Sequence, residues 1–163
     1  MAGLAVTTSD WKVVLVRHGE ATSTIENPER PLTIDGRRHA EQVASWLEMQ
    51  DIDLDAIVHS GKLRARQTAK IFGNRLGVPP SRVYETAGLD PNDDPQPMAD
   101  RLESERSSVM VVGHLPNLNR LASTLLVGGA ASLQFRFIDA GAVILAQGRG
   151  GWQVEAVVGH DLI

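Results

Sequence analysis

Two arginines and two histidines of this sequence follow closely on short apolar, β-branched runs. Arg17 and His18 follow the run 11–16, Arg64 comes after the run 56–58, and His114 comes after the run 109–112. Guanidinium groups present a planar fork of N–H donors that matches phosphate oxygens, and an unprotonated imidazole can attack phosphorus. These residue types predict phosphoryl-group chemistry, with several fixed donors around one possible nucleophile.

The elements that must position these side chains alternate between strand and helix patterns. We expect strands over 11–16, 56–58, 82–84, 109–112, 142–146 and 152–158, and helices over about 33–50, 63–76, 98–103 and from 118 to a stop at 128–129. Residues 88–97 read as a loop, and 148–151 as a hairpin turn. The pattern predicts an α/β fold, a three-layer α/β/α sandwich whose mostly parallel central sheet ends in an antiparallel C-terminal edge. Parallel strands deliver their following residues to one edge, where ligands bind.

Composition limits the class of protein. The 163 residues suit one domain, 1–163, and the net charge of −4 argues against nucleic-acid or anionic-membrane partners. The absence of cysteine excludes disulfides, thiolate metal sites and a cysteine nucleophile. Met1–Val6 lacks the features of a secretory signal, and no run is long and apolar enough to span a membrane. We therefore expect a cytoplasmic protein.

Four ordered segments carry a family resemblance. They are Arg17-His18-Gly19, Arg30-Pro31-Leu32-Thr33-x-x-Gly36, Ser60-x-x-x-Arg64-Ala65-x-Gln67-Thr68, and Val112-Gly113-His114-x-Pro116. Taken together they resemble the histidine phosphatase superfamily, also called phosphoglycerate-mutase-like, and in particular its small SixA-type phosphohistidine phosphatases. The resemblance implies the phosphoglycerate-mutase-like fold and covers nearly the whole chain.

The resemblance also implies a role for each matching residue. His18 would take the phosphoryl group and become phosphohistidine, which water then hydrolyses. Arg17 and Arg64 would clamp the transferring oxygens, a protonated His114 would donate to a further oxygen, and Gly19 would let the chain pass closely beneath the phosphate. No metal and no cofactor are expected, because the arginines supply the positive charge.

Two positions remain open between alternatives. Arg30 could line the rim of the pocket and bind substrate, or could serve only the structure of its loop. A general acid for a poor leaving group could be Asp94, Asp93 or Glu20, although adjacent loop carboxylates are more often only solvated.

The missing acid bears on the substrate. A phosphohistidine leaving group needs no dedicated carboxylic acid, and the 114 − 64 = 50 residues between the second and third motifs leave little room for a helical lid. We therefore expect an open, lid-free site acting on a phosphorylated protein such as a phosphohistidine carrier. A phosphatase for small phosphorylated metabolites is the alternative, and a non-catalytic phosphate-binding module is a further one. The sequence does not indicate an oligomeric state.

The remaining histidines suggest less. His39 is expected to face solvent and His59 to be structural or to support the site, while the sequence assigns no partner to His160. A metal site built from these three is a second possible chemistry, but their spacings match no ligand motif. Gly61 stands where relatives commonly carry proline, so the turn before Arg64 is expected to be loose.

Overall fold

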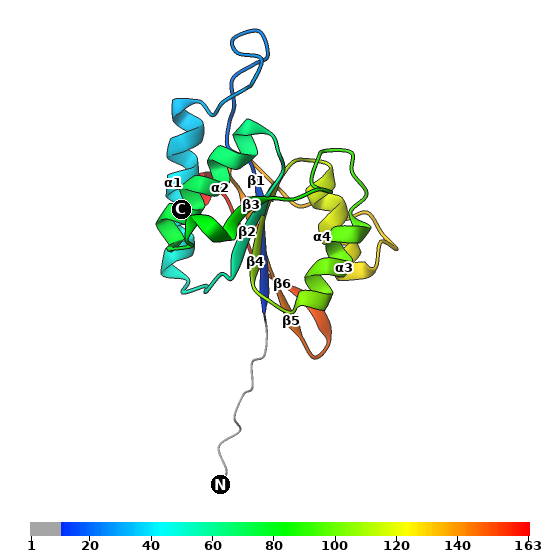
Figure 1. Cartoon of the computed structure of the whole chain (residues 1–163). Coiled ribbons are helices and arrows are strands. Elements are labelled where there is room, and N and C mark those ends of the chain that lie inside the picture. The colour runs from blue at the N-terminus through cyan, green and yellow to red at the C-terminus, as the bar shows by residue number, and fades with distance from the viewer. Residues whose placement is uncertain (1–10) are drawn as a thin grey trace.

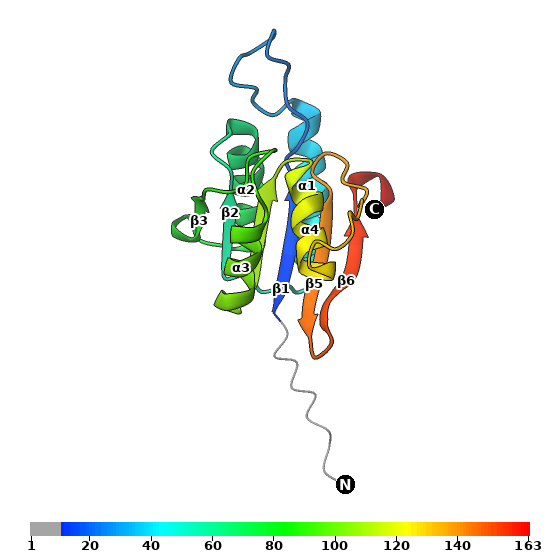
Figure 2. The same ribbon diagram turned by 90° about the vertical axis from the view of Figure 1, so that its right-hand side faces the viewer.

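The computed structural model describes residues 11–163, which form one sheet with helices on both faces (Figures 1 and 2). Its strands are β1 (Lys12–Arg17), β2 (Ala56–His59), β3 (Val83–Glu85), β4 (Val109–Gly113), β5 (Ala142–Gly148) and β6 (Gly151–Val158). Its helices are α1 (Ile34–Met49), α2 (Leu63–Leu76), α3 (Gln96–Glu105) and α4 (Asn117–Val127), with single 3₁₀ turns at Pro80–Arg82 and His160–Leu162. The predicted segment Met1–Val6 lies outside the described residues.

The order of strands in the sheet is β3-β2-β4-β1-β5-β6. The pairs β3–β2, β2–β4 and β4–β1 are parallel, whereas β1–β5 and β5–β6 are antiparallel. The expected α/β fold with a mostly parallel sheet and an antiparallel C-terminal edge is therefore confirmed. Arg17 stands opposite Gly113 in the β1–β4 register, so the polar residues that follow these two strands start side by side.

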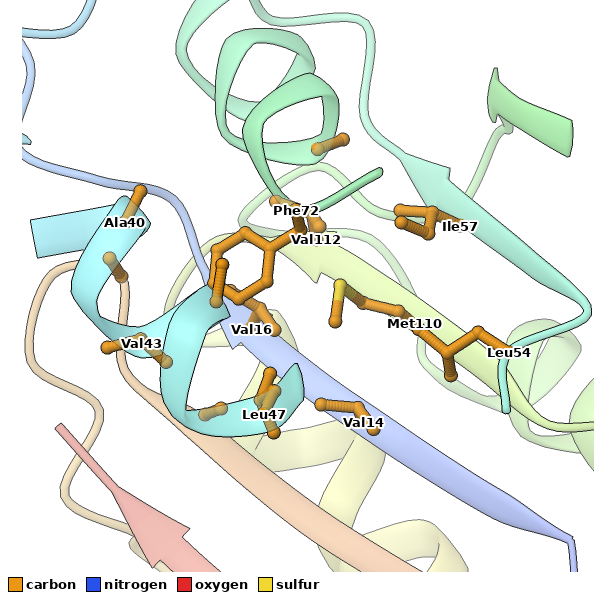
Figure 3. Close-up of a cluster of buried hydrophobic side chains, with 14 of the residues drawn as sticks. Val14, Val16, Ala40, Val43, Leu47, Leu54, Ile57, Phe72, Met110 and Val112 are labelled. Atoms are coloured by element: carbon orange, nitrogen blue, oxygen red, sulfur yellow. The ribbon is translucent and has the colours of Figure 1, made fainter. Parts of the chain in front are cut away.

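The sheet separates two apolar clusters. Val14 and Val16 of β1 face the layer made by α1 and α2, and Val13 and Leu15 face the layer made by α3 and α4, as the alternation along a strand requires. Figure 3 shows Phe72 of α2 pointing toward the sheet within the first cluster. Because both faces are covered, the four central residues of β1, Val13–Val16, are all apolar and buried.

The helix boundaries follow from local chemistry. Thr33 caps α1 by accepting the backbone N–H of Gly36, and Gly77 ends α2 in a left-handed conformation at φ 71°. Helix α3 runs from Gln96 to Glu105 and is longer than expected at both ends, and the carboxylate of Asp94 accepts the N–H of its first residue, Gln96, at 3.0 Å. Among residues 11–163, no helix combines the length and the apolar character needed to cross a bilayer.

Candidate active site

His18 and His114, the histidines of the first and third motifs, lie close together where β1 and β4 end. His18 directly follows β1, and its backbone N–H donates to the carbonyl of Gly113 at the end of β4. His114 directly follows β4, and the ring centroids of His18 and His114 are 5.0 Å apart. Parallel neighbouring strands thus bring together residues that lie far apart in the chain.

The hydrogen bond of His18 defines which of its nitrogens is free. Its Nδ1 lies 2.7 Å from the carbonyl oxygen of Gly19, which can only accept, so Nδ1 carries the proton. Burial lowers the pKa of His18 to about 4, an effect that the Gly19 hydrogen bond opposes and that the charges of Arg64, Arg17 and Arg30 reinforce. The ring is neutral near pH 7, and its Nε2 presents a lone pair.

Three arginines, Arg17, Arg30 and Arg64, act electrostatically on His18. Arg17 is fixed from both ends, since its Nη1 donates to the carbonyl of Phe137 at 2.8 Å and its backbone N–H to that of Gly141. The Nε of Arg64 is buried and has no hydrogen-bond partner among the described residues. Its pKa lies below the ordinary value because of burial and the neighbouring charge of Arg30. A buried N–H without a partner is costly, so this group is suited to an incoming anion.

Arg30 has a structural contact within its loop and an electrostatic effect on the site. Its Nε donates to the carbonyl of Thr22 at 2.9 Å, across the loop that joins β1 to α1. Its charge nevertheless contributes to lowering the pKa of both His18 and His114. Arg30 itself adopts a left-handed backbone conformation at φ 51°, which is uncommon for a residue other than glycine, asparagine or aspartate.

His114 is neutral rather than protonated, which corrects the expectation from the sequence. Burial, followed by the charges of His18 and Arg64, lowers its pKa to about 3. Its Nε2 lies 2.6 Å from the hydroxyl of Ser60, while its Nδ1 is buried and unpartnered among the described residues. A neutral ring has one N–H, so its value as a donor depends on which nitrogen holds the proton.

Close backbone packing holds the nucleophile loop. A side chain on Gly19 would stand 2.8 Å from the carbonyl oxygen of Gly36. The N–H of Gly19 donates at 2.9 Å to the hydroxyl of Thr68, which in turn donates to the carbonyl of Arg64 at 2.8 Å. Thr68 therefore links the loop that carries His18 to the helix that carries Arg64. The sequence places Thr68 in the second motif but assigns it no such role.

The three candidate acids each have another contact. Glu20 accepts a hydrogen bond from the hydroxyl of Thr33 at 2.8 Å. Asp94 caps α3, and Asp93 accepts the backbone N–H of Asp90 at 2.9 Å. No carboxylate is among the groups that shift the pKa of His18 or His114 in residues 11–163.

The carboxylate of Asp90, in the loop before α3, acts on Arg64: it raises the pKa of Arg64, whereas burial lowers it. It also lies 4.0 Å from the Nζ of Lys62. Both residues line a hollow of about 410 Å³ beside the start of α2, together with Gly61 and Glu85. A side chain at Gly61 would collide with the Glu85 carboxylate, so glycine here admits an acidic side chain to the wall of that hollow.

His39 was expected to face solvent, but its side chain is only 16% exposed, and both His39 and His160 contact Asp139. The Nδ1 of His39 lies 2.9 Å from the carboxylate of Asp139, and the His160 Nε2 lies 3.6 Å from its other oxygen. The two rings stack, with centroids 3.5 Å apart and planes 4° from parallel. His59 is not part of this cluster; it is buried and its Nδ1 bonds to the Ser60 carbonyl.

His39, Asp139 and His160 together offer two imidazoles and one carboxylate, a set of ligands that suits zinc. The lone pairs of an imidazole lie in its ring plane, however, and two parallel planes 3.5 Å apart do not converge on one ion. The cluster as it stands is a hydrogen-bonded clamp. Burial alone would raise the pKa of Asp139, but the His39 hydrogen bond, the charge of His160 and the N–H of Glu20 hold it below its ordinary value.

Comparison with known proteins gives a consistent picture. A family model described as the histidine phosphatase superfamily (branch 1) matches residues 13–89. The phosphohistidine phosphatase SixA of Escherichia coli is 28% identical over 151 residues, covering 88% of this chain and 93% of the relative. An uncharacterised protein of Picosynechococcus is 31% identical over 119 residues, 69% of this chain and 71% of its own length.

A solved structure carries the likeness further. The protein histidine phosphatase SixA in complex with tungstate superposes with a TM-score of 0.81 at 25% identity, and the match covers 93% of this chain and 98% of that one. The similarity therefore extends over almost the whole sheet and its helices.

Proposed function

Because this chain belongs to the histidine phosphatase superfamily, we propose that it removes phosphoryl groups from phosphohistidine carried on another protein, through a phosphohistidine formed on its own His18. Phosphatase chemistry follows from the family. The substrate and the residue roles are proposed from the geometry of the site.

One observation carries the proposal: a neutral His18 with a free Nε2 lone pair lies within the electrostatic influence of Arg64, Arg17 and Arg30. The carbonyl of Gly19 holds the proton on the other nitrogen, and burial keeps the ring unprotonated. Nε2 would attack phosphorus while the P–N bond of the substrate breaks, and the substrate imidazole would leave with a proton from solvent. Arg17 and Arg64 would hold the oxygens of the transferring group.

The second half of the reaction restores the enzyme. A water molecule would attack phosphorus on phosphorylated His18, the P–N bond would break, and the electron pair would return to Nε2. Inorganic phosphate would leave with the proton balance completed by solvent. The arginines supply the positive charge in both steps, so we propose that no metal takes part.

No carboxylate of residues 11–163 is among the groups that shift the pKa of His18 or His114, and this supports phosphohistidine over phosphate esters. An alkoxide leaves poorly without an acid, whereas a protonated imidazole leaves readily. Glu20, Asp93 and Asp94 are each engaged by another donor, although Asp90 and Glu85 line the hollow beside α2. SixA of Escherichia coli is by its name a phosphohistidine phosphatase. Only a 3₁₀ turn, β3 and α3 stand between α2 and β4, so we also propose a lid-free single domain whose open site accepts a protein partner.

A substrate panel tests the proposal. The purified protein is given a phosphorylated histidine-carrier protein, a sugar phosphate and an aryl phosphate, with His18→Asn as the matched inactive control. We expect rapid release of phosphate from the carrier and slow release from the esters. Rapid quenching in alkali should trap a phosphorylated enzyme that loses its label in acid. Good ester cleavage with an untouched carrier would support the small-metabolite alternative, and no labelled enzyme with any donor would support a phosphate-binding module.

A further inference from the structure

Ser60 is buried beside His114, and its hydroxyl contacts the ring of that histidine. Ser60 is 1% exposed and His114 2% exposed, and the distance from Oγ to Nε2 is 2.6 Å. At that distance one of the two groups donates a hydrogen bond to the other. Which of them donates decides which nitrogen of His114 carries the ring proton.

We propose that Ser60 is a positioning residue that donates its hydroxyl hydrogen to Nε2 of His114 and so fixes the ring proton on Nδ1, as the donor to the phosphoryl group. The catalytic consequence rests on the proposed function, whereas the tautomer itself is a property of the resting protein. The same ring type then serves two opposite purposes, since His18 offers a lone pair and His114 offers an N–H.

The hydrogen-bond accounting around Ser60 favours this direction. The backbone N–H of Lys62 donates to Oγ at 3.4 Å and occupies an acceptor position, so the hydroxyl hydrogen is free to point at Nε2. In the reverse arrangement Nε2–H would donate to Oγ, and the hydroxyl hydrogen would need another acceptor. No such acceptor is found for Ser60 among residues 11–163. The proposed direction leaves one buried group unpaired, the Nδ1–H of His114, whereas the reverse leaves two, the Ser60 hydroxyl hydrogen and the Nδ1 lone pair.

The unpartnered Nδ1 supports the same direction. Nδ1 of His114 is buried without a hydrogen-bond partner, in a ring 5.0 Å from that of the nucleophile. If Nδ1 carried a lone pair, that lone pair would repel an approaching phosphoryl oxygen. If it carries the proton, the unsatisfied N–H finds its acceptor only when the anion arrives. The Nδ1–H of His114 then gains its hydrogen bond only when the phosphoryl group is bound.

Long-range ¹H–¹⁵N correlation spectra of protein with labelled histidine test the tautomer directly. We expect His114 to show a protonated Nδ1 and a bare Nε2, with the signal assigned by its loss in His114→Gln. In Ser60→Ala the preference should relax toward a mixture of tautomers. A protonated Nε2 in the wild-type protein would overturn the proposal, whether or not the protein cleaves phosphohistidine.

Kinetics test the consequence. We expect Ser60→Ala to lower kcat about tenfold with little change in KM, because the correct tautomer remains accessible but is no longer imposed. Ser60→Thr, which keeps a hydroxyl, should recover most of the rate, and the exposed Ser81→Ala is the control for loss of a serine elsewhere. An Ser60→Ala protein that folds, keeps the wild-type tautomer and keeps the wild-type kcat would contradict the role.

Discussion

The backbone N–H of Gly19 donates a hydrogen bond to the side-chain hydroxyl of Thr68, 2.9 Å away on the helix of the opposite motif. Thr68 is fully buried and passes the bond on to the carbonyl of Arg64. The nucleophile loop and the phosphate-binding helix are therefore fixed to each other through one hydroxyl. Neither element holds its place independently.

Replacing Thr68 with valine removes the hydroxyl while keeping the shape of the side chain. The buried N–H of Gly19 then has no acceptor, so we expect a loss of about 1–3 kcal/mol in the free energy of unfolding and a lower kcat. Urea denaturation and phosphate-release kinetics measure both effects. Thr68→Ser, which retains the hydroxyl, should stay close to the wild type; equal losses in both variants would count against the hydrogen bond as the cause.

Arg64→Lys separates charge from geometry. Lysine keeps the positive charge but cannot offer the planar fork, so we expect kcat/KM to fall about 100-fold. Arg66, two residues along the same helix and exposed, provides the matched control. Steady-state kinetics of Arg66→Lys should be unchanged, and a similar fall in both variants would show that the effect comes from the helix surface as a whole.

Gly36→Ala tests the close approach of α1 to the nucleophile loop. A methyl group at Gly36 would collide with the backbone carbonyl of Glu20, which cannot move as a flexible side-chain end would. We expect destabilisation of about 1–3 kcal/mol, the usual range for overpacking, together with a loss of activity. Gly150→Ala meets no atom within 4 Å and should melt like the wild type.

The depressed pKa values of His18 and His114 predict acid sensitivity of the folded state. Their pKa values of about 4 and about 3 lie below the ordinary 6.5, so the unfolded chain binds protons first as the pH falls. Stability should be complete above about pH 6.5 and decline from there toward about pH 4. Thermal melts across this range measure the decline, which His18→Gln should reduce. A pH-independent melting temperature would contradict these shifts.

Most of the fold could be predicted because its signals are local. Strands such as β4 are buried on both faces and consist of apolar, often β-branched residues, and α2 was bounded correctly because Gly77 stops it and prolines follow. The mostly parallel sheet with its antiparallel edge was predicted from the alternation of elements, whereas the order of the strands was not. His18 and His114 directly follow the ends of β1 and β4, so their meeting could be expected from the sequence, while their roles stay a prediction.

The rest depends on contacts between distant segments. The environment of His39 is created by Asp139 and by the C-terminal turn that carries His160, and nothing near residue 39 announces either. The charge state of His114 could not be read from its neighbours in sequence, since burial by the folded sheet is what lowers its pKa. The other contacts of the candidate acids likewise depend on how the loops return.

The position of β1 in the sheet has a consequence for when the site comes into existence. β1 is the first strand of residues 11–163, yet its two neighbours are β4 and β5, and the acceptor for the Arg17 side chain is the Phe137 carbonyl. During synthesis the residues of the first motif emerge long before the segments that complete them. Pairing at such sequence separation is slow to form. A nascent chain therefore carries its nucleophile unassembled until Phe137 and β5 have been made.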